Sequence, residues 1–232
     1  MAGALQTLER LRKDLVANVA HELRTPLANL QGYLEAMRDG VTPASAATIG
    51  SLHEEVIRLV RLVEALHELS LFDARLPRLR LETVDLGTLV RRLVDLRRGE
   101  FAAQEIAVES QVTVNGVARA DPDLLSQALH NLIDNALKYT PRGGEVLVDV
   151  APDGAAVRVA VTNTGEGIAP DDLPFIFERF YRGEKSRSRE SGGAGIGLSI
   201  VKEVARVHGG QVGAHSEGGR TTLWLTLPGA SA

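Results

Sequence analysis

The sequence predicts an α plus α/β protein, in which a helical hairpin precedes a two-layer α/β sandwich. Residues 5 to about 73 hold two long helical patterns with almost no glycine. From Leu81 onward, short runs with β-strand character alternate with helical ones. A chain of 232 residues with 44% hydrophobic content can bury a sizeable core, and its length suits one large or two modest domains. The change of pattern near residue 80 favours two. We therefore expect one domain over residues 1–79 and a second over residues 80–232.

The helical hairpin is predicted from its apolar spacing and its loop. The first helical pattern runs to about Arg38 and ends before Gly40 and Pro43. In the second, apolar residues alternate at three- and four-residue spacing, at Ile49, Leu52, Val56, Leu59, Val63 and Leu66. A lone hairpin leaves such stripes uncovered, so we expect a homodimer in which two hairpins form a four-helix bundle. A hairpin packed on the rest of its own chain is the alternative.

One histidine of the first helical pattern lies away from the apolar stripe. At about 100° per residue, the stripe contains Leu8, Leu15, Val19, Leu23, Leu27, Leu30 and Leu34. His21 lies close to the opposite side of the helix, among the small residues Ala17, Thr25 and Ala28. This placement indicates an imidazole that another molecule can reach. A solvated surface pair of His21 and Glu22 is the alternative.

Local signals predict the elements of the second domain. A helix is expected over residues 86–103, followed by strands over 106–112 and 115–120. Asp121 as N-cap and Pro122 at the first helical position begin the next helix, which ends before Pro141. The remaining elements are a hairpin of strands 145–150 and 155–162, a helix over 196–208, and strands 211–214 and 221–227.

Charge and composition exclude several classes of function. A net charge of −4 and a pI near 5.9 provide no electrostatic case for binding nucleic acid. The chain has no cysteine, which excludes disulfides, thiolate metal sites and thiol catalysis. No apolar run reaches the ~18 residues of a membrane helix, and the N-terminus lacks the apolar core of a signal peptide. As given, the chain is expected to be a soluble protein.

The helix that starts after Asp121 carries a polar cluster. Asn131, Asn135 and Lys138 recur at four- and three-residue spacing, so they share one face of the helix. Amide oxygens suit Mg²⁺, and a lysine one turn further on suits a phosphate. An ordinary solvated face is the alternative.

Two glycine-rich segments complete the candidate site. The segment 163–168 follows a strand, and its glycines permit close approach of a ligand to the backbone. The segment 192–198 opens a helix, whose exposed amides favour a polyphosphate. It resembles a dinucleotide fingerprint but lacks the βαβ frame, which argues against a nicotinamide cofactor. We expect the charged stretch 182–191 to be a mobile lid that orders on nucleotide.

Five motifs together resemble the catalytic core of the sensor histidine kinases of two-component signalling. They are residues 21–27 (His-Glu-Leu-Arg-Thr-Pro-Leu, like the H box), 131–139 (N box), 163–167 (G1 box), 176–182 (F box) and 193–198 (G2 box). Their order and spacing cover nearly the whole chain. The resemblance implies the Bergerat ATP-binding fold, which Hsp90-type chaperones, gyrase B and mismatch-repair ATPases share. Those relatives carry no H box.

The resemblance also implies roles for individual residues. His21 would accept the γ-phosphoryl group of ATP, Glu22 would take up its ring proton, and Arg182 would stabilise charge during transfer. Thr25 matches the residue that positions water for dephosphorylating a response regulator. Asn135 would hold Mg²⁺. The other implied nucleotide-site residues are Asn131, Lys138, Tyr139, Gly193, Gly195 and Gly197 near the phosphates, Asn163, Gly165, Gly167 and Thr221 near adenine, and Ile168, Phe180, Ile196 and Leu198.

One position departs from the family pattern. Most members carry aspartate where this chain has Asn163. An amide oxygen can still accept a hydrogen bond from the exocyclic amine of adenine, but without the assistance of a charge. We therefore expect weaker ATP binding than an aspartate at this position would provide.

Two functions remain open from the sequence. The first is a histidine kinase that autophosphorylates with ATP and Mg²⁺ and passes the phosphoryl group to an aspartate of a response regulator. It would also act as a phosphatase of that regulator. The second is a dimeric signalling scaffold that is weakly active or dominated by phosphatase activity. Because such kinases usually carry a sensor before the H box, the chain is expected to be the cytoplasmic portion of a larger, membrane-anchored protein.

Overall fold

The computed structural model describes residues 23–75, 79–113, 116–179, 181, 183 and 195–229. The chain forms two compact units that meet between Glu68 and Leu69, inside the long helix α2 (Ala46–Arg75). Within the described ranges, no helix is both long and apolar enough to cross a membrane.

The first unit contains the expected helical hairpin. One helix covers residues 23–38, and α2 begins after a loop in which Gly40 has φ +72°. The hydroxyl of Ser45 accepts a hydrogen bond from the backbone N–H of Thr48 (3.1 Å) and thereby caps the start of α2. Several large apolar side chains of this unit are about half exposed or more: Leu27, Tyr33, Leu34, Ile49, Val56, Val60 and Val63.

The second unit is built on a five-stranded sheet with the order β2-β4-β5-β7-β6. The strands are β2 (Ala107–Val112), β4 (Glu145–Asp153), β5 (Ala156–Thr164), β7 (Arg220–Pro228) and β6 (Val212–Glu217). Strands β2 and β4 are parallel, and the other neighbours are antiparallel. The expected hairpin around Gly154 joins β4 to β5, and this glycine has φ +61°.

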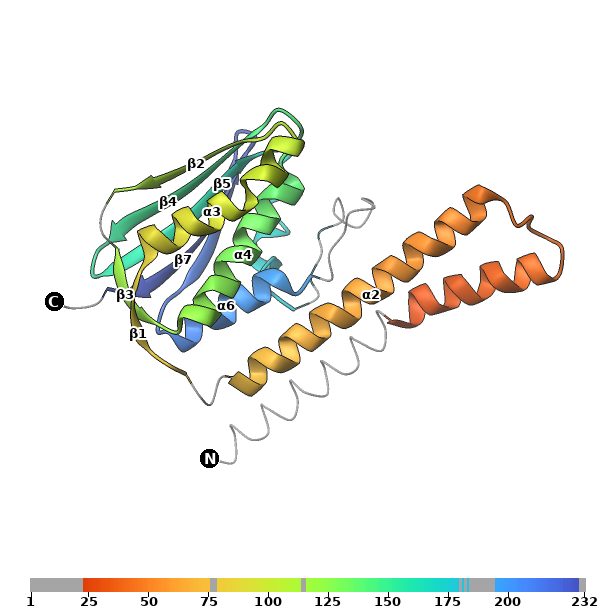
Figure 1. Ribbon diagram of the computed structural model, residues 1–232, viewed down its shortest axis with the longest axis horizontal. Coiled ribbons are helices and arrows are strands. Elements are labelled where there is room, and N and C mark those ends of the chain that lie inside the picture. The colour runs from red at the N-terminus through yellow and green to blue at the C-terminus, as the bar shows by residue number, and fades with distance from the viewer. Residues whose placement is uncertain are drawn as a thin grey trace. The chain divides into compact units, whose positions relative to one another are not determined.

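Three helices cover one face of this sheet, which confirms the two-layer α/β sandwich (Figure 1). They are α3 (Leu86–Ala103), α4 (Pro122–Tyr139) and α6 (Gly197–Val207), and a short 3₁₀ helix, η2, covers Leu173–Phe175. Their apolar sides and the inward face of the sheet form the core. Its largest fully buried side chains are Phe101, Leu86, Leu124, Leu125, Leu129, Leu132, Ile133, Ile200, Leu223, Leu225 and Leu227.

The helix starts of the second unit differ in how they are capped. Asp121 caps α4 as expected, because its carboxylate accepts from the backbone N–H of Asp123 (3.1 Å) and of Leu124 (3.2 Å). Asp85 caps α3 by accepting from Thr88. No side chain of the described ranges caps α6, whose N-cap residue is Ile196. Among the described residues, the first amides of α6 therefore have no side-chain cap of the kind that α3 and α4 have.

A small second sheet lies outside the sandwich. Strand β1 (Glu82–Asp85) pairs antiparallel with β3 (Val117–Ala120). The sequence predicts β3, but it predicts no strand just before Leu86. Strand β1 is four residues long and mostly exposed, so it lacks the apolar alternation that marks a strand in sequence.

The apolar rows of the two central strands end in polar residues. On β5 the inward row is Val157, Val159, Val161 and then Asn163. On β7, read toward its start, it is Leu227, Leu225, Leu223 and then Thr221. Asn163 and Thr221 are direct partners in the β5–β7 register, so the helix-covered face becomes polar at one end of the sheet.

Candidate functional site

The polar end of the sheet places Asn163 beside Thr221. Both residues are buried, with exposed fractions of 4% and 7%. Nδ2 of Asn163 donates to the carbonyl oxygen of Thr164 at 3.0 Å. Since a carbonyl oxygen can only accept, this contact fixes which way the amide points. It leaves Oδ1 of Asn163 as the atom that can accept a hydrogen bond from a ligand.

The loop 163–168 lies between the end of α4 and the last hairpin of the chain. A Cβ on Gly165 would lie 2.8 Å from the carbonyl oxygen of Tyr139, so a side chain would collide with the end of α4. The backbone N–H of Gly165 donates to the carbonyl of Gly219, in the turn between β6 and β7 (2.9 Å). Gly167 has φ +78°, which favours glycine. The structure thus brings Tyr139 and the loop together, as the two motifs require.

Ser216 is a member of the site that sequence reasoning missed. Its hydroxyl oxygen accepts a hydrogen bond from the backbone N–H of Ile168 (2.8 Å) and lies 3.0 Å from Oγ1 of Thr221. It therefore joins the loop 163–168 to strand β7. No sequence signal distinguishes it, because a serine between His215 and Glu217 is typical of a solvent-facing edge strand.

The predicted polar face of α4 is present and half-buried. Asn131, Asn135 and Lys138 share this face, and the ammonium of Lys138 lies 4.9 Å from the ring centre of Tyr139. Nδ2 of Asn131 is buried and has no hydrogen-bond partner among the described residues. A buried amide without a partner is costly, so a ligand that accepts from it would recover that energy.

The start of α6 faces Asn131. A Cβ on Gly197 would lie 3.3 Å from Oδ1 of Asn131, so the two helices approach closely at this point. Gly195 has φ +72°, Ile196 is buried at 2% exposure, and Leu198 is half-buried. The uncapped first turn of α6 and the unpartnered amide of α4 are thus neighbours. Together they offer hydrogen-bond donors and a positive helix end to an anion.

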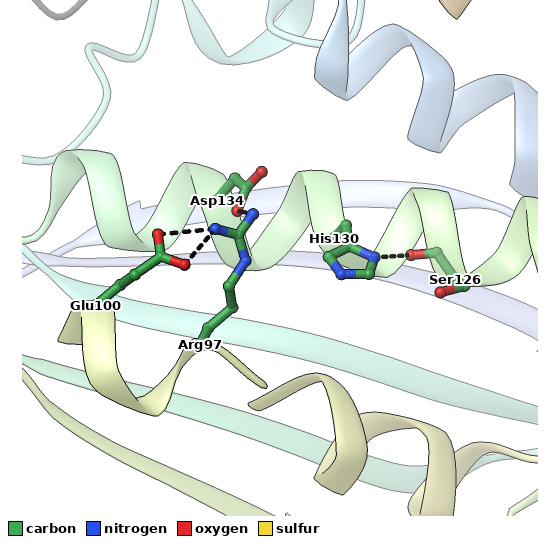
Figure 2. A network of polar contacts seen from close by, with 5 residues as sticks. All are labelled: Arg97, Glu100, Ser126, His130 and Asp134. Atoms are coloured by element: carbon green, nitrogen blue, oxygen red, sulfur yellow. Dashed lines mark hydrogen bonds and ion pairs between the residues drawn. The ribbon is translucent and has the colours of Figure 1, made fainter. Parts of the chain in front are cut away.

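A polar network holds the flank of α4 that faces α3 (Figure 2). The guanidinium of Arg97 contacts Oδ1 of Asp134 (2.5 Å) and Oε1 of Glu100 (2.6 Å). Nδ1 of His130 lies 3.0 Å from the carbonyl oxygen of Ser126, so that nitrogen carries the proton. Burial raises the pKa of the Asp134 carboxyl above its ordinary value, and this outweighs the opposing effect of Arg97.

Several predicted site residues lie outside the described residues. They are His21, Glu22, Phe180, Arg182 and Gly193, together with most of the expected lid. Thr25 is described and lies on an exposed side of the helix over residues 23–38.

The described residues fit a magnesium-bound nucleotide. The unpartnered amide of Asn131 and the uncapped start of α6 suit phosphate oxygens, and the amide of Asn135 is a hard oxygen ligand. The buried pair of Asn163 and Thr221 suits a polar heterocycle. Among the described residues, no cluster of histidine and acidic side chains could hold a metal by itself.

Comparison with known proteins identifies two domains. Residues 11–75 match the His Kinase A (phospho-acceptor) domain. Residues 120–231 match the histidine kinase-, DNA gyrase B- and HSP90-like ATPase family.

Individual relatives agree with this assignment. The histidine-protein kinase BaeS of Escherichia coli is 36% identical over 98% of this chain and 49% of its own length, so the chain spans about half of that relative. The solved structure of ShkA, in complex with AMPPNP, is 31% identical, covers 94% of this chain and 46% of that one, and has a TM-score of 0.63. The mycobacterial sensor histidine kinase MprB is 31% identical over 66% of this chain and 100% of its own, with a TM-score of 0.56. This chain therefore belongs to the sensor histidine kinases and comprises their phospho-acceptor and ATPase domains.

Proposed function

We propose that this chain phosphorylates itself on His21 with ATP and Mg²⁺ and then passes the phosphoryl group to an aspartate of a response regulator. The observation that carries the proposal is that the start of α6 lies beside Nδ2 of Asn131, and that neither has a side-chain partner within the described ranges. This is an anion site on the scaffold of an ATPase family. The AMPPNP in the structure of ShkA, an analogue of ATP, supports the same ligand class here.

The residues of α4 and α6 would position the phosphates. The amides of Gly195, Ile196, Gly197 and Leu198, with Gly193 before them, would donate to the phosphate oxygens. Lys138 would supply a point charge from the facing helix. Asn135 would hold Mg²⁺, which neutralises charge on the phosphates when it is bound.

The phosphoryl transfer itself would depend on four side chains. A ring nitrogen of His21 attacks the γ-phosphorus, the bond from phosphorus to the β–γ bridging oxygen breaks, and ADP leaves. Glu22 takes up the ring proton, so that the imidazole regains a neutral charge. Arg182 stabilises the charge that develops on the γ-phosphate, and Phe180 borders the nucleotide. Transfer to the regulator then restores His21.

The base of the nucleotide would occupy the polar end of the sheet. Asn163 and Thr221 supply the hydrogen-bonding groups there, and Gly165, Gly167 and Ile168 border the base. Tyr139 closes this end from the side of α4.

The helical hairpin would act as the dimerisation and phosphotransfer domain, over residues 1–79. The exposure of Leu27, Leu34, Ile49 and Val63 supports a second copy as the partner that covers these side chains. Residues 80–232 would form the catalytic ATP-binding domain. Light scattering of the full chain tests this part, with a dimer mass expected and a monomer contradicting it.

The kinase activity is tested with γ-labelled ATP and Mg²⁺ on the full chain. Label that is acid-labile, and that His21→Gln abolishes, is expected. His215→Gln is a matched control, because His215 is an exposed histidine beside a glutamate, 3.4 Å from Glu217. If no label appeared at any nucleotide concentration, the kinase activity would be contradicted, and the dimeric signalling scaffold would be the remaining function.

Two further reactions are tested with purified receiver domains: transfer of the phosphoryl group to the receiver, and the later removal of phosphate from it. Labelled chain should lose its label to a receiver domain, and should not lose it to the same domain with its acceptor aspartate changed to asparagine. Thr25→Ala is expected to slow removal of phosphate from the receiver without reducing the labelling of His21. Equal loss of both activities in Thr25→Ala would contradict this role.

A further inference from the structure

The hydroxyl of Ser216 is a junction between two parts of the site. It accepts from the backbone N–H of Ile168 at 2.8 Å and lies 3.0 Å from Oγ1 of Thr221. A Cβ on Gly167 would lie 3.0 Å from the same oxygen. One side chain on β6 therefore holds the loop 163–168 and contacts a buried side chain on β7.

The hydrogen bonds of Ser216 determine whether the hydroxyl of Thr221 can donate to a ligand. A serine hydroxyl has one proton and two lone pairs, and the N–H of Ile168 occupies one of the lone pairs. The Ser216 proton can therefore be donated to Oγ1 of Thr221. When it is, the proton of Thr221 is left for an acceptor on a bound base. In this arrangement Thr221 acts as a donor.

The neighbouring Asn163 has the opposite polarity. Its Nδ2 is engaged by the carbonyl of Thr164 at 3.0 Å, which leaves Oδ1 as an acceptor. Asn163 and Thr221 are direct partners across β5 and β7, so the acceptor and the donor are adjacent. The pairing edge of adenine has an amine donor next to a ring-nitrogen acceptor, whereas a 6-oxopurine has these two polarities reversed.

We propose that Ser216 is a positioning residue that makes the site selective for adenine, by holding Thr221 as a donor beside the acceptor Oδ1 of Asn163. This inference rests on the proposed function, because it specifies how the same nucleotide site recognises its base. Ser216 acts through Thr221 and through the loop, without itself touching the base.

The test compares the binding of ATP and inosine triphosphate to the full chain, by equilibrium titration. Loss of the Ile168 contact weakens both nucleotides alike, whereas loss of the oriented donor weakens ATP alone. Wild-type chain is expected to prefer ATP. In Ser216→Ala, ATP should bind about 5- to 30-fold more weakly, and the preference for ATP over inosine triphosphate should fall by at least about 5-fold. Ser216→Thr keeps the hydroxyl and should restore the preference.

The opposite face of the sheet supplies a matched control. Thr162 and Thr222 form a hydroxyl pair at 2.8 Å, one residue along from Asn163 and Thr221 in the same register. Thr162→Val removes this pair and should leave both affinities unchanged. In autophosphorylation, Ser216→Ala should raise KM for ATP and leave kcat near that of wild type.

The outcomes separate the inference from the proposed function. If wild-type chain binds neither nucleotide, the proposed function is overturned, and the inference with it. If wild-type chain binds ATP but Ser216→Ala weakens both nucleotides equally, or neither, the inference alone is overturned. The inference is also overturned if Ser216→Thr unfolds at the wild-type temperature but no longer prefers ATP over inosine triphosphate.

Discussion

Nε2 of His208 accepts a hydrogen bond from the backbone N–H of Asp121 at 2.9 Å, linking the end of α6 to the start of α4. Nδ1 of the same ring lies 2.7 Å from the carbonyl oxygen of Val204 and must donate to it. The buried imidazole is therefore neutral, with its proton on Nδ1. Asp121 in turn accepts from the backbone N–H of Arg80 at 3.0 Å. The two helices α4 and α6 are thus joined at the end opposite to the proposed phosphate site.

Replacing His208 should reveal the cost of this link. His208→Ala leaves the buried N–H of Asp121 without a partner, and the free energy of unfolding should fall by roughly 1–3 kcal/mol, plus the lost packing. His208→Gln can place an oxygen near the position of Nε2 and should lose less. Urea unfolding at neutral pH measures both. An equal loss in the two variants would show that packing alone is responsible.

The Asp121 cap should make stability depend on acidic pH. Burial raises the pKa of this carboxyl. Hydrogen bonds from the N–H groups of Arg80, Leu124 and Asp123 lower it by more than burial raises it, so the pKa lies below its ordinary value. A lowered folded-state pKa adds stability above the unfolded-state pKa, and this is lost as the pH falls through the folded-state pKa. Asp121→Ala should cost roughly 0.5–2 kcal/mol at pH 7. The difference in free energy of unfolding between wild type and Asp121→Ala, measured by urea unfolding, should become smaller below a pH of about 4. A gap that stays constant with pH would contradict the ionised cap.

Asn131 should show opposite effects on binding and stability. Its Nδ2 is buried without a described partner, so Asn131→Ala removes an unpaired amide. Thermal unfolding without nucleotide should therefore occur at an equal or higher temperature. ATP binding should weaken by about tenfold or more, because a donor to the ligand is lost. A variant that is destabilised yet binds ATP normally would contradict the proposed role.

Gly165 should tolerate no side chain. A Cβ there would lie 2.8 Å from the carbonyl oxygen of Tyr139, which is backbone and cannot rotate away. Gly165→Ala should shift the loop and weaken nucleotide binding by about tenfold, as a misplaced contact group does. Gly99→Ala is the control, since within the described ranges a Cβ there meets no atom within 4 Å. That change should stabilise α3 by about 0.5–1 kcal/mol and leave binding unchanged.

Asn163→Asp should raise the affinity for ATP and lower the stability of the nucleotide-free protein. A carboxylate oxygen makes a stronger, charge-assisted hydrogen bond with the amine of adenine, so ATP should bind more tightly, by about tenfold. The carboxylate also loses the donor that Asn163 directs at the carbonyl of Thr164, so the nucleotide-free protein should unfold at a lower temperature. Titration with ATP and thermal unfolding measure the two effects. Binding that is no tighter than wild type would contradict the expectation.

Local signals predicted most of the elements, though not β1 or η2, whereas the pairing of the strands depends on residues far apart in sequence. Asp121 and Pro122 mark the start of α4, and Gly209, at φ +73°, directly follows the expected helix over residues 196–208. The parallel pairing of β2 with β4 has no local signal, because the two strands are separated by β3 and α4.

The same limit applies to the site. The glycines and amides that we propose as ligand contacts form recognisable motifs, as around Asn131 and Gly165. Ser216 and His208 act through contacts with residues about 50 and 90 positions earlier, and neither has a distinctive neighbour in sequence. Side chains that position other side chains can be found only once the fold brings them together.

During synthesis, the hydrogen bond from Gly165 to Gly219 can form only after the turn between β6 and β7 has been made. Every motif from the N box to the G2 box leaves the ribosome before the turn that contains Gly219. A nascent chain halted after α6 would carry the groups for the phosphates, yet it would lack Ser216, Thr221 and the carbonyl that anchors the loop. In the proposed site, the part that would distinguish one base from another is therefore complete only after the hairpin of β6 and β7 has been synthesised.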